Sequence, residues 1–125
     1  MTILEWASRL AVATAGLLIV GIVAVDAAGA FAVGACGAYG YAFDYTQISE
    51  ARTAAAHKCS GACKIVGEIR HGCAAFAIDV KHPCGSFGWA TNAHLGQAEN
   101  ASLHRCYQFG GRDCVVRAWA CDEKG

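Results

Sequence analysis

The sequence has little charge and no excess of either sign. Among its 125 residues, Lys and Arg number 10 and Asp and Glu also number 10, so the formal net charge is zero. This balance argues against a nucleic acid partner, because nucleic acids are bound by concentrated basic faces. Charged residues make up only 16% of the chain and apolar residues 55%, which excludes an intrinsically disordered protein. The length allows one folded domain.

Charge is scarcest near the N-terminus. Residues 10–25 form an unbroken run of apolar or small residues, and Asp26 follows it. As a signal peptide, this run would be the hydrophobic region, and Ala28-Gly29-Ala30 would be the cleavage site. As a retained transmembrane anchor, a helix over residues 3–30 would span the bilayer, with Asp26 at the far interface.

Both interpretations assign residues 1–30 to the leader and residues 31–125 to an extracytoplasmic, Cys-rich domain. All eight cysteines lie in this second part. An even number of cysteines outside the cytoplasm indicates a disulfide framework, and small domains need such cross-links because their cores are thin.

The Cys-rich part repeats itself along the chain. Cys36-Gly-Ala-Tyr-Gly-Tyr-Ala returns 48 positions later as Cys84-Gly-Ser-Phe-Gly-Trp-Ala. A second set returns 47 positions later, with Ala51, Ala54, His57, Lys58 and Cys59 corresponding to Ala98, Ala101, His104, Arg105 and Cys106. Matches in the same order indicate two half-domains with one plan.

The periodicity of apolar residues predicts the plan of each half. Alternating or aromatic-rich segments predict strands at residues 31–35, 39–45, 64–69, 76–80, 87–91 and 115–120. Small and apolar residues at helical spacing predict helices at residues 47–58 and around residues 95–106. The order β-β-α-β thus occurs twice. We expect an α+β fold: one disulfide-stapled domain with a mostly antiparallel sheet, behind an N-terminal hydrophobic helix.

The repeat also suggests how the cysteines pair. Cys59–Cys63 and Cys106–Cys114 would each join the end of a helix to the next strand. Cys36–Cys84 and Cys73–Cys121 would link equivalent points of the two halves. These longer loops would contribute most to stability, about 4 kcal/mol each in the chain-entropy model.

The order of these motifs resembles a known family. The aromatic-Gly-aromatic strands, the Ala-rich helices that end in Cys, the stretch Gly110-Gly-Arg-Asp-Cys114 and the terminal Val-Val-Arg-Ala-Trp-Ala-Cys are similar to a bacterial secreted domain of unknown function, the family numbered 4189. The resemblance covers residues 31–121. It implies an exported, disulfide-bonded α+β domain and carries no catalytic residues over. It also implies that Cys36 and Cys84 are additions to a six-cysteine pattern.

Residues that serve in metal or acid–base sites elsewhere are present but do not form a convincing set. His57 and His104 lie near cysteines with closer disulfide partners, so these cysteines are not expected to bind zinc. An even cysteine count leaves no thiol for a Cys–His nucleophile. The carboxylates are scattered and are expected on a solvated face: Asp44, Glu50, Glu68 and Asp79. We therefore expect no catalytic residue, no metal and no cofactor, and a protein that is not an enzyme.

The aromatic residues are crowded on two equivalent strands. Those at residues 39–45 alternate and share one face, and residues 87–89 repeat the pattern. Core packing is the first interpretation, because helices with Ala faces leave room for large partners. A surface strip for partner binding is the alternative, with Tyr41 and Trp89 as candidate contact residues.

We expect a non-catalytic interaction module on the periplasmic side of the inner membrane. Its single-pass anchor would join it, as an accessory subunit, to a larger integral membrane complex. In the anchor, Gly16 and Gly21 would let a neighbouring helix approach closely. The alternative is a freely secreted or periplasmic binding protein, of the inhibitor or immunity type, that signal peptidase releases.

Overall fold

The computed structural model describes residues 27–122. It confirms an α+β domain in which the order β-β-α-β occurs twice. The first half consists of β1 (Ala28–Val33), β2 (Tyr39–Tyr45), α2 (Ile48–Lys58) and β3 (Lys64–Ile69), with a short 3-10 turn, η2 (Ala35–Gly37), after β1. The second half consists of β4 (Cys73–Asp79), β5 (Phe87–Asn92), α3 (Leu95–Gln108) and β6 (Cys114–Cys121).

The expected N-terminal hydrophobic helix lies in residues 1–26, outside the described residues. Among residues 27–122, no helix has the length and apolar character needed to span a membrane.

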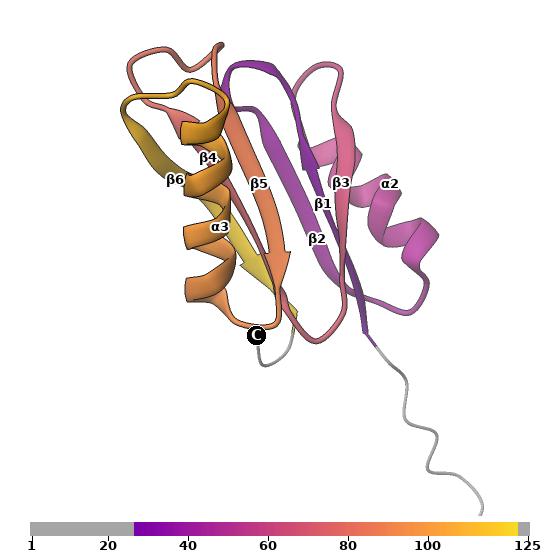
Figure 1. Cartoon of the computed structure of the whole chain (residues 1–125). Coiled ribbons are helices and arrows are strands. Elements are labelled where there is room, and N and C mark those ends of the chain that lie inside the picture. Colours follow the sequence, from indigo (N-terminus) through magenta and orange to yellow (C-terminus); the bar gives the residue numbers. More distant parts are fainter. Residues whose placement is uncertain (1–26, 123–125) are drawn as a thin grey trace, which may run out of the picture.

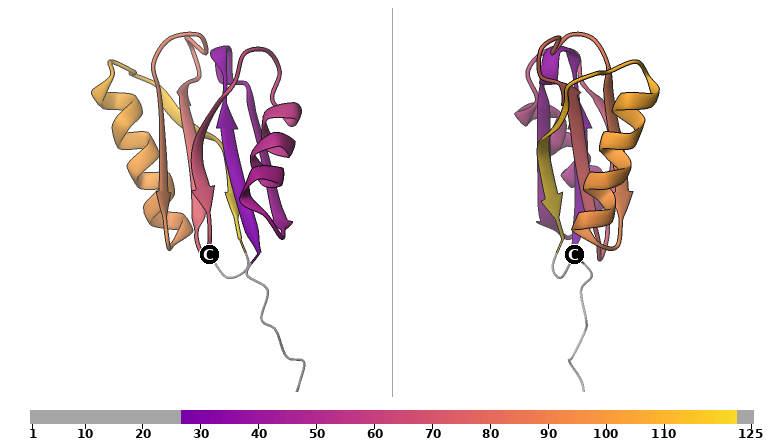
Figure 2. Two further views of the ribbon diagram at one scale, coloured as in Figure 1. Left: turned by 90° about the vertical axis from the view of Figure 1, so that its right-hand side faces the viewer. Right: turned by 60° about the vertical axis from the view of Figure 1, so that its left-hand side comes forward.

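The expectation of one sheet is wrong, because each half forms a sheet of its own. Both sheets are three-stranded and antiparallel, with strand orders β2-β1-β3 and β5-β4-β6. They pack face to face, and α2 and α3 cover the two outer faces (Figures 1 and 2). The domain therefore has four layers in the order helix, sheet, sheet, helix. The apolar inner face of each sheet is buried by the other sheet.

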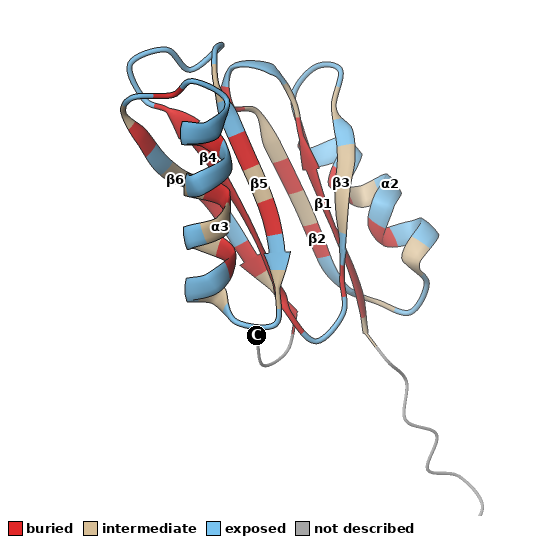
Figure 3. Ribbon diagram, in the orientation of Figure 1, coloured by how far each residue is buried: buried red, intermediate tan, exposed pale blue. Residues whose placement is uncertain are grey.

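The central strands β1 and β4 are buried along their whole length (Figure 3). In β1, Ala30 and Ala32 pack against α2, whereas Phe31 and Val33 face the other sheet. Strand β4 repeats this alternation, with small residues toward α3 and Phe76 toward the first sheet. Small side chains on one face bring the helix close, and large ones on the other fill the core between the sheets.

Two equivalent glycines set the distance between each helix and its sheet. A side chain at Gly40 would collide with the backbone of Ala55 in α2 and of Cys59 directly after it. A side chain at Gly88 would collide in the same way with the backbone of α3. The aromatic-Gly-aromatic motif is thereby explained. Its glycine lies under the helix, and its aromatic residues point to the opposite face of the strand.

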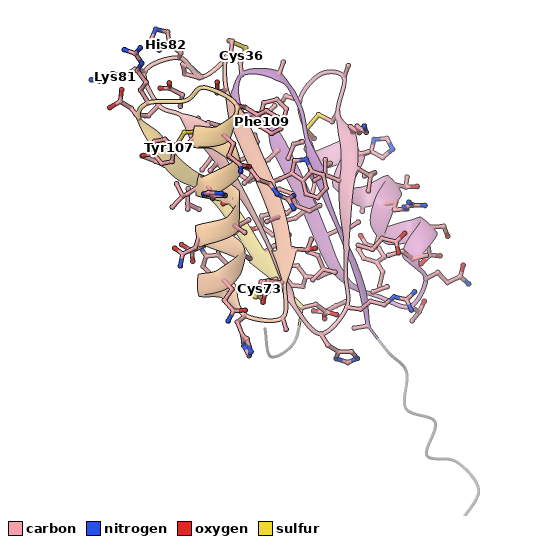
Figure 4. All side chains as sticks on the ribbon, viewed as in Figure 1. Cys36, Cys73, Lys81, His82, Tyr107 and Phe109 are labelled. Atoms are coloured by element: carbon pink, nitrogen blue, oxygen red, sulfur yellow. A yellow bond between two sulfur atoms is a disulfide. The ribbon has the colours of Figure 1, made fainter. Side chains whose placement is uncertain are left out.

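Four disulfides use all eight cysteines. They join the same pairs that the repeat suggests, but Cys73–Cys121 does not link the two halves. These two residues are opposite each other in the β4–β6 ladder, so the bond closes the second sheet. Cys36–Cys84 does join the halves, at the end of the sandwich opposite to Cys73 (Figure 4). Such a disulfide-rich domain is typical of an extracellular or periplasmic environment.

A substitution at Gly88 tests the helix–sheet distance. Gly88→Ala should lower the free energy of unfolding by about 2 kcal/mol, because the added methyl group forces α3 away from β5. Gly96→Ala is the matched control in α3, where an added methyl group meets no atom within 4 Å. It should raise stability by about 0.5 kcal/mol. Urea unfolding of both variants measures the difference, and equal effects would contradict the account.

A second test concerns the start of the domain, because β1 begins at Ala28 and not at residue 31. Ala28 pairs with Tyr45, Gly29 with Ile69, and Ala30 with Ala42. A chain that begins at Phe31 loses these pairings and two buried methyl groups. It should be less stable than a chain that begins at Ala28 by about 3 kcal/mol or more, at about 0.8 kcal/mol for each methyl and about 1 for each hydrogen bond. Equal melting temperatures would show that Ala28–Ala30 lies outside the domain.

Candidate partner-binding grooves

Two grooves lie where the edge strands of the two sheets face each other. Strand β2 contacts β6 on one side of the sandwich, and β3 contacts β5 on the other. The β2/β6 groove has a volume of about 490 Å³, and the β3/β5 groove has a volume of about 550 Å³. Because β2 corresponds to β5 and β3 to β6, the two grooves are equivalent in the plan of the repeat.

Stacked rings form one wall of the β2/β6 groove. The rings of Tyr39 and Tyr41 are 6.4 Å apart, those of Tyr41 and Phe43 are 5.9 Å apart, and all three are nearly parallel. The stack grades from the core to solvent, since Tyr39 and Tyr41 pack against the inter-sheet core while Phe43 is 42% exposed. The groove thus presents aromatic surface to solvent. On the other wall, Ala118 and Ala120 of β6 face the inter-sheet core. Trp119 lies between them and pairs with Ala75, so its side chain is on the face of the second sheet that α3 covers, where it is 52% exposed.

Arg117 reaches from β6 across one end of this groove. Its Nε donates a hydrogen bond to the carbonyl oxygen of Gly37 at 3.2 Å, and its guanidinium lies 5.4 Å from the ring centre of Tyr39. A cation over an aromatic face is attracted by the ring electrons. The Tyr39 end of the groove is therefore positively charged, and the Phe43 end is apolar.

The β3/β5 groove is organised differently. Phe87 and Trp89 of β5 line it together with Ile65 and Val66 of β3. Arg105 of α3 donates a hydrogen bond from Nη1 to the carbonyl oxygen of Trp89 at 2.7 Å, and its guanidinium lies 5.4 Å from the Trp89 ring centre. This contact secures the end of α3 to the edge strand.

The two candidate contact residues of the domain therefore lie in different grooves. Tyr41 lines the β2/β6 groove and Trp89 the β3/β5 groove, and both also pack against the inter-sheet core. The structure adds Arg117, which contacts Gly37 and Tyr39 across the groove. The sequence offered no signal for it beyond a cationic residue in an otherwise apolar last strand. Gly16 and Gly21 lie outside the described residues.

The residues considered for metal or acid–base chemistry are dispersed. His57 and His104 are exposed on different helices, and their neighbouring cysteines are in disulfides. Glu68 pairs with Arg52 at 3.2 Å, and Asp44 and Glu50 are exposed. Among residues 27–122, no group of His, Cys, Asp and Glu has an arrangement suited to a metal ion.

Asp79 differs from expectation, because it is buried and not on a solvated face. Its Oδ1 accepts hydrogen bonds from the backbone N–H groups of Lys81 at 3.0 Å and His82 at 3.3 Å, and its Oδ2 accepts one from Arg112 at 3.3 Å. Burial alone would raise the pKa of this carboxyl. The three backbone donors and the nearby His82 ring lower it by more, so the pKa of Asp79 lies below its ordinary value of 3.8. The carboxylate joins the β4–β5 loop, where Lys81 and His82 lie side by side, to the α3–β6 loop (Figure 4).

Comparison with known proteins gives one match. A family model described as "Domain of unknown function (DUF4189)" matches residues 28–121. No curated protein and no solved structure matches the chain.

The role of Asp79 predicts a specific pH dependence. Its folded pKa lies below the unfolded value, so its contribution to stability is fully present above the unfolded value and is lost as the pH falls through the folded pKa. Asp79→Asn should therefore lower the melting temperature at neutral pH, and the difference from the parent chain should shrink toward about pH 2. Circular dichroism melts measure both values.

The control is Asp113→Asn, which removes an exposed ion pair with Lys81 at 3.7 Å. It should change the melting temperature very little, because exposed pairs contribute little. A difference between Asp79→Asn and the parent chain that stays constant down to the lowest pH would contradict a structural role for the ionised carboxylate.

Proposed function

Because the chain belongs to the family described as "Domain of unknown function (DUF4189)", which assigns it no activity, we propose a function from the grooves: the domain is a non-catalytic interaction module that binds a protein partner outside the cytoplasm. The β2/β6 groove carries this proposal. Phe43 exposes apolar surface beside the half-buried Tyr39 and Tyr41, and aromatic side chains that border a rigid pocket are typical of protein interfaces.

The rigidity of the domain supports a binding function rather than one that depends on a conformational change. Both central strands are fully buried, and Cys36–Cys84 fixes the two halves to each other. A partner that docks on such a surface pays little entropy for ordering it. The four disulfides also fit an oxidising compartment, where the partner would be found.

The leader adds a second part to the proposal. Residues 10–25 are apolar enough to form most of a membrane anchor, which would make the protein a single-pass accessory subunit of a larger inner-membrane complex. In this arrangement Gly16 and Gly21 would pack against a neighbouring transmembrane helix, and the domain would dock on the periplasmic part of the same complex.

A freely secreted or periplasmic binding protein is the second candidate. One observation favours it: β1, the first strand that the structure describes, begins at Ala28, where the family match also begins, so a chain cut before Ala28 would keep every described strand and helix. Release after Ala30 would cut into β1, so a released form should begin no later than Ala28.

Co-purification from membranes separates the two candidates. The full chain should be found in the membrane fraction with an intact leader and should bring its complex with it in mild detergent. Gly16→Leu combined with Gly21→Leu should keep the chain in the membrane but lower recovery of the complex at least about tenfold, because helix packing is lost while apolar character is kept.

The control is Leu18→Phe combined with Ile22→Phe, which adds apolar bulk on the side of the helix opposite to Gly16 and Gly21 and should leave recovery unchanged. A soluble mature form that starts at Ala28 would exclude the anchored subunit and would support the secreted binding protein.

A further inference from the structure

The equivalent edge strands β2 and β5 differ in one contact, which a basic residue at the end of the helix makes with an aromatic residue of the strand. Sequence correspondence pairs Tyr41 with Trp89 and Lys58 with Arg105. The structure agrees with this pairing, because Gly40 lies against the backbone of Lys58 and Gly88 lies against Arg105. The plan of the repeat therefore allows the same contact in both halves, and only the second half makes it.

In the second half, Arg105 covers the edge of its sheet. The helix that carries Arg105 packs on one face of the sheet, and the Trp89 ring packs on the opposite face, against the inter-sheet core. Arg105 touches both the Trp89 ring and the Trp89 carbonyl oxygen, so its side chain passes around the free edge of β5. A side chain in this position blocks the addition of another strand to β5.

In the first half, no side chain of residues 27–122 covers the corresponding edge, that of β2. The side chain of Lys58 makes no hydrogen bond or ion pair in the part of the chain that the structure describes. Within residues 27–122, no side chain bonds a carbonyl oxygen of β2. An edge strand with unpaired N–H and C=O groups is a template for another strand. The Tyr41 and Phe43 rings stand beside this edge, in the β2/β6 groove.

The charges around this edge select a partner of one sign. Arg117 is the only charged residue among those that the structure places in the β2/β6 groove. Lys58 lies on the other face of β2, at the end of α2. Near Tyr39, both faces of the β2 edge therefore carry a positive charge. Asp44 lies at the opposite end of β2 and repels acidic side chains there. The acidic part of a partner is therefore expected near Tyr39.

We propose that the β2 edge binds an extended, acidic segment of a partner protein, which adds to the first sheet as a fourth strand. This inference rests on the proposed function and names the chemistry of the partner. Backbone hydrogen bonds to β2 hold the segment, and apolar side chains at alternate positions enter the groove on Tyr41 and Phe43. Acidic side chains at one end face Arg117 and Lys58.

A display experiment with the full chain in mild detergent tests the proposal. The probe is a library of random 12-residue peptides. Selected peptides should alternate apolar and other residues and should carry Asp or Glu toward one end. Methylation of the backbone nitrogen at every second residue should weaken binding about tenfold or more in one alternate set and little in the other, because only one set bonds to β2.

Matched variants in the two grooves test whether the peptide binds at the β2 edge. Phe43→Glu should weaken peptide binding about tenfold or more, whereas Phe87→Glu in the other groove should leave it unchanged; the two side chains are 42% and 45% exposed, so both variants should fold. Lys58→Arg keeps charge and helix propensity but supplies the side chain that covers the edge in the second half, so it should also weaken binding.

The proposal is overturned by a library that yields no binder, by equal effects of the two methylated sets, or by binding that survives both Phe43→Glu and Lys58→Arg. Self-association of the chain that Phe43→Glu abolishes would make a second copy the occupant, and would overturn the assignment to a partner segment. Recovery of the membrane complex by a Lys58→Arg chain that no longer binds peptide would leave the proposed function intact and reject the β2 edge as its contact.

Discussion

Both faces of the central strands β1 and β4 are buried, and this double burial determines the spacing of the other layers. On one face, residues such as Ala30 and Ala75 are small, so each helix lies close to its sheet. On the other face, Phe31 and Phe76 fill the space between the sheets. A thin helix–sheet layer and a thick sheet–sheet layer follow from one alternation of small and large residues. The four edge strands are left to contact solvent.

The two halves share this architecture but not the state of their edges. In the second half an arginine covers the edge strand, and in the first half no side chain of residues 27–122, including the lysine at the equivalent position, covers it. This single exchange of Arg for Lys changes the edge, because a guanidinium group can donate a hydrogen bond to a carbonyl oxygen and lie on an aromatic ring at the same time. A compact ammonium group does this less well. One half can therefore serve as scaffold while the other presents a binding edge.

The order of elements and the cysteine pairs could be predicted from the sequence, because the periodicity of apolar residues, the spacing of the repeated motifs and the even cysteine count can all be read without knowing the fold. The division into two sheets could not, since strands alternate in the same way in either arrangement. The burial of Asp79 depends on Arg112, a residue 33 positions away, and no local pattern reports such a contact. The start of β1 was missed because Ala28-Gly29-Ala30 is equally typical of a leader. The contact between Arg105 and Trp89 could not be predicted either, because it depends on how α3 packs on β5.

Residue-resolved amide hydrogen exchange on the full chain, alone and with its partner bound, tests the central claim most directly. The account predicts that amides of β2 on its free edge exchange rapidly in the chain alone and become protected in the complex. The edge of β5, which Arg105 covers, should change little. Protection that appears on β5 or on the helices, with β2 unchanged, would contradict the claim that the β2 edge is the binding surface.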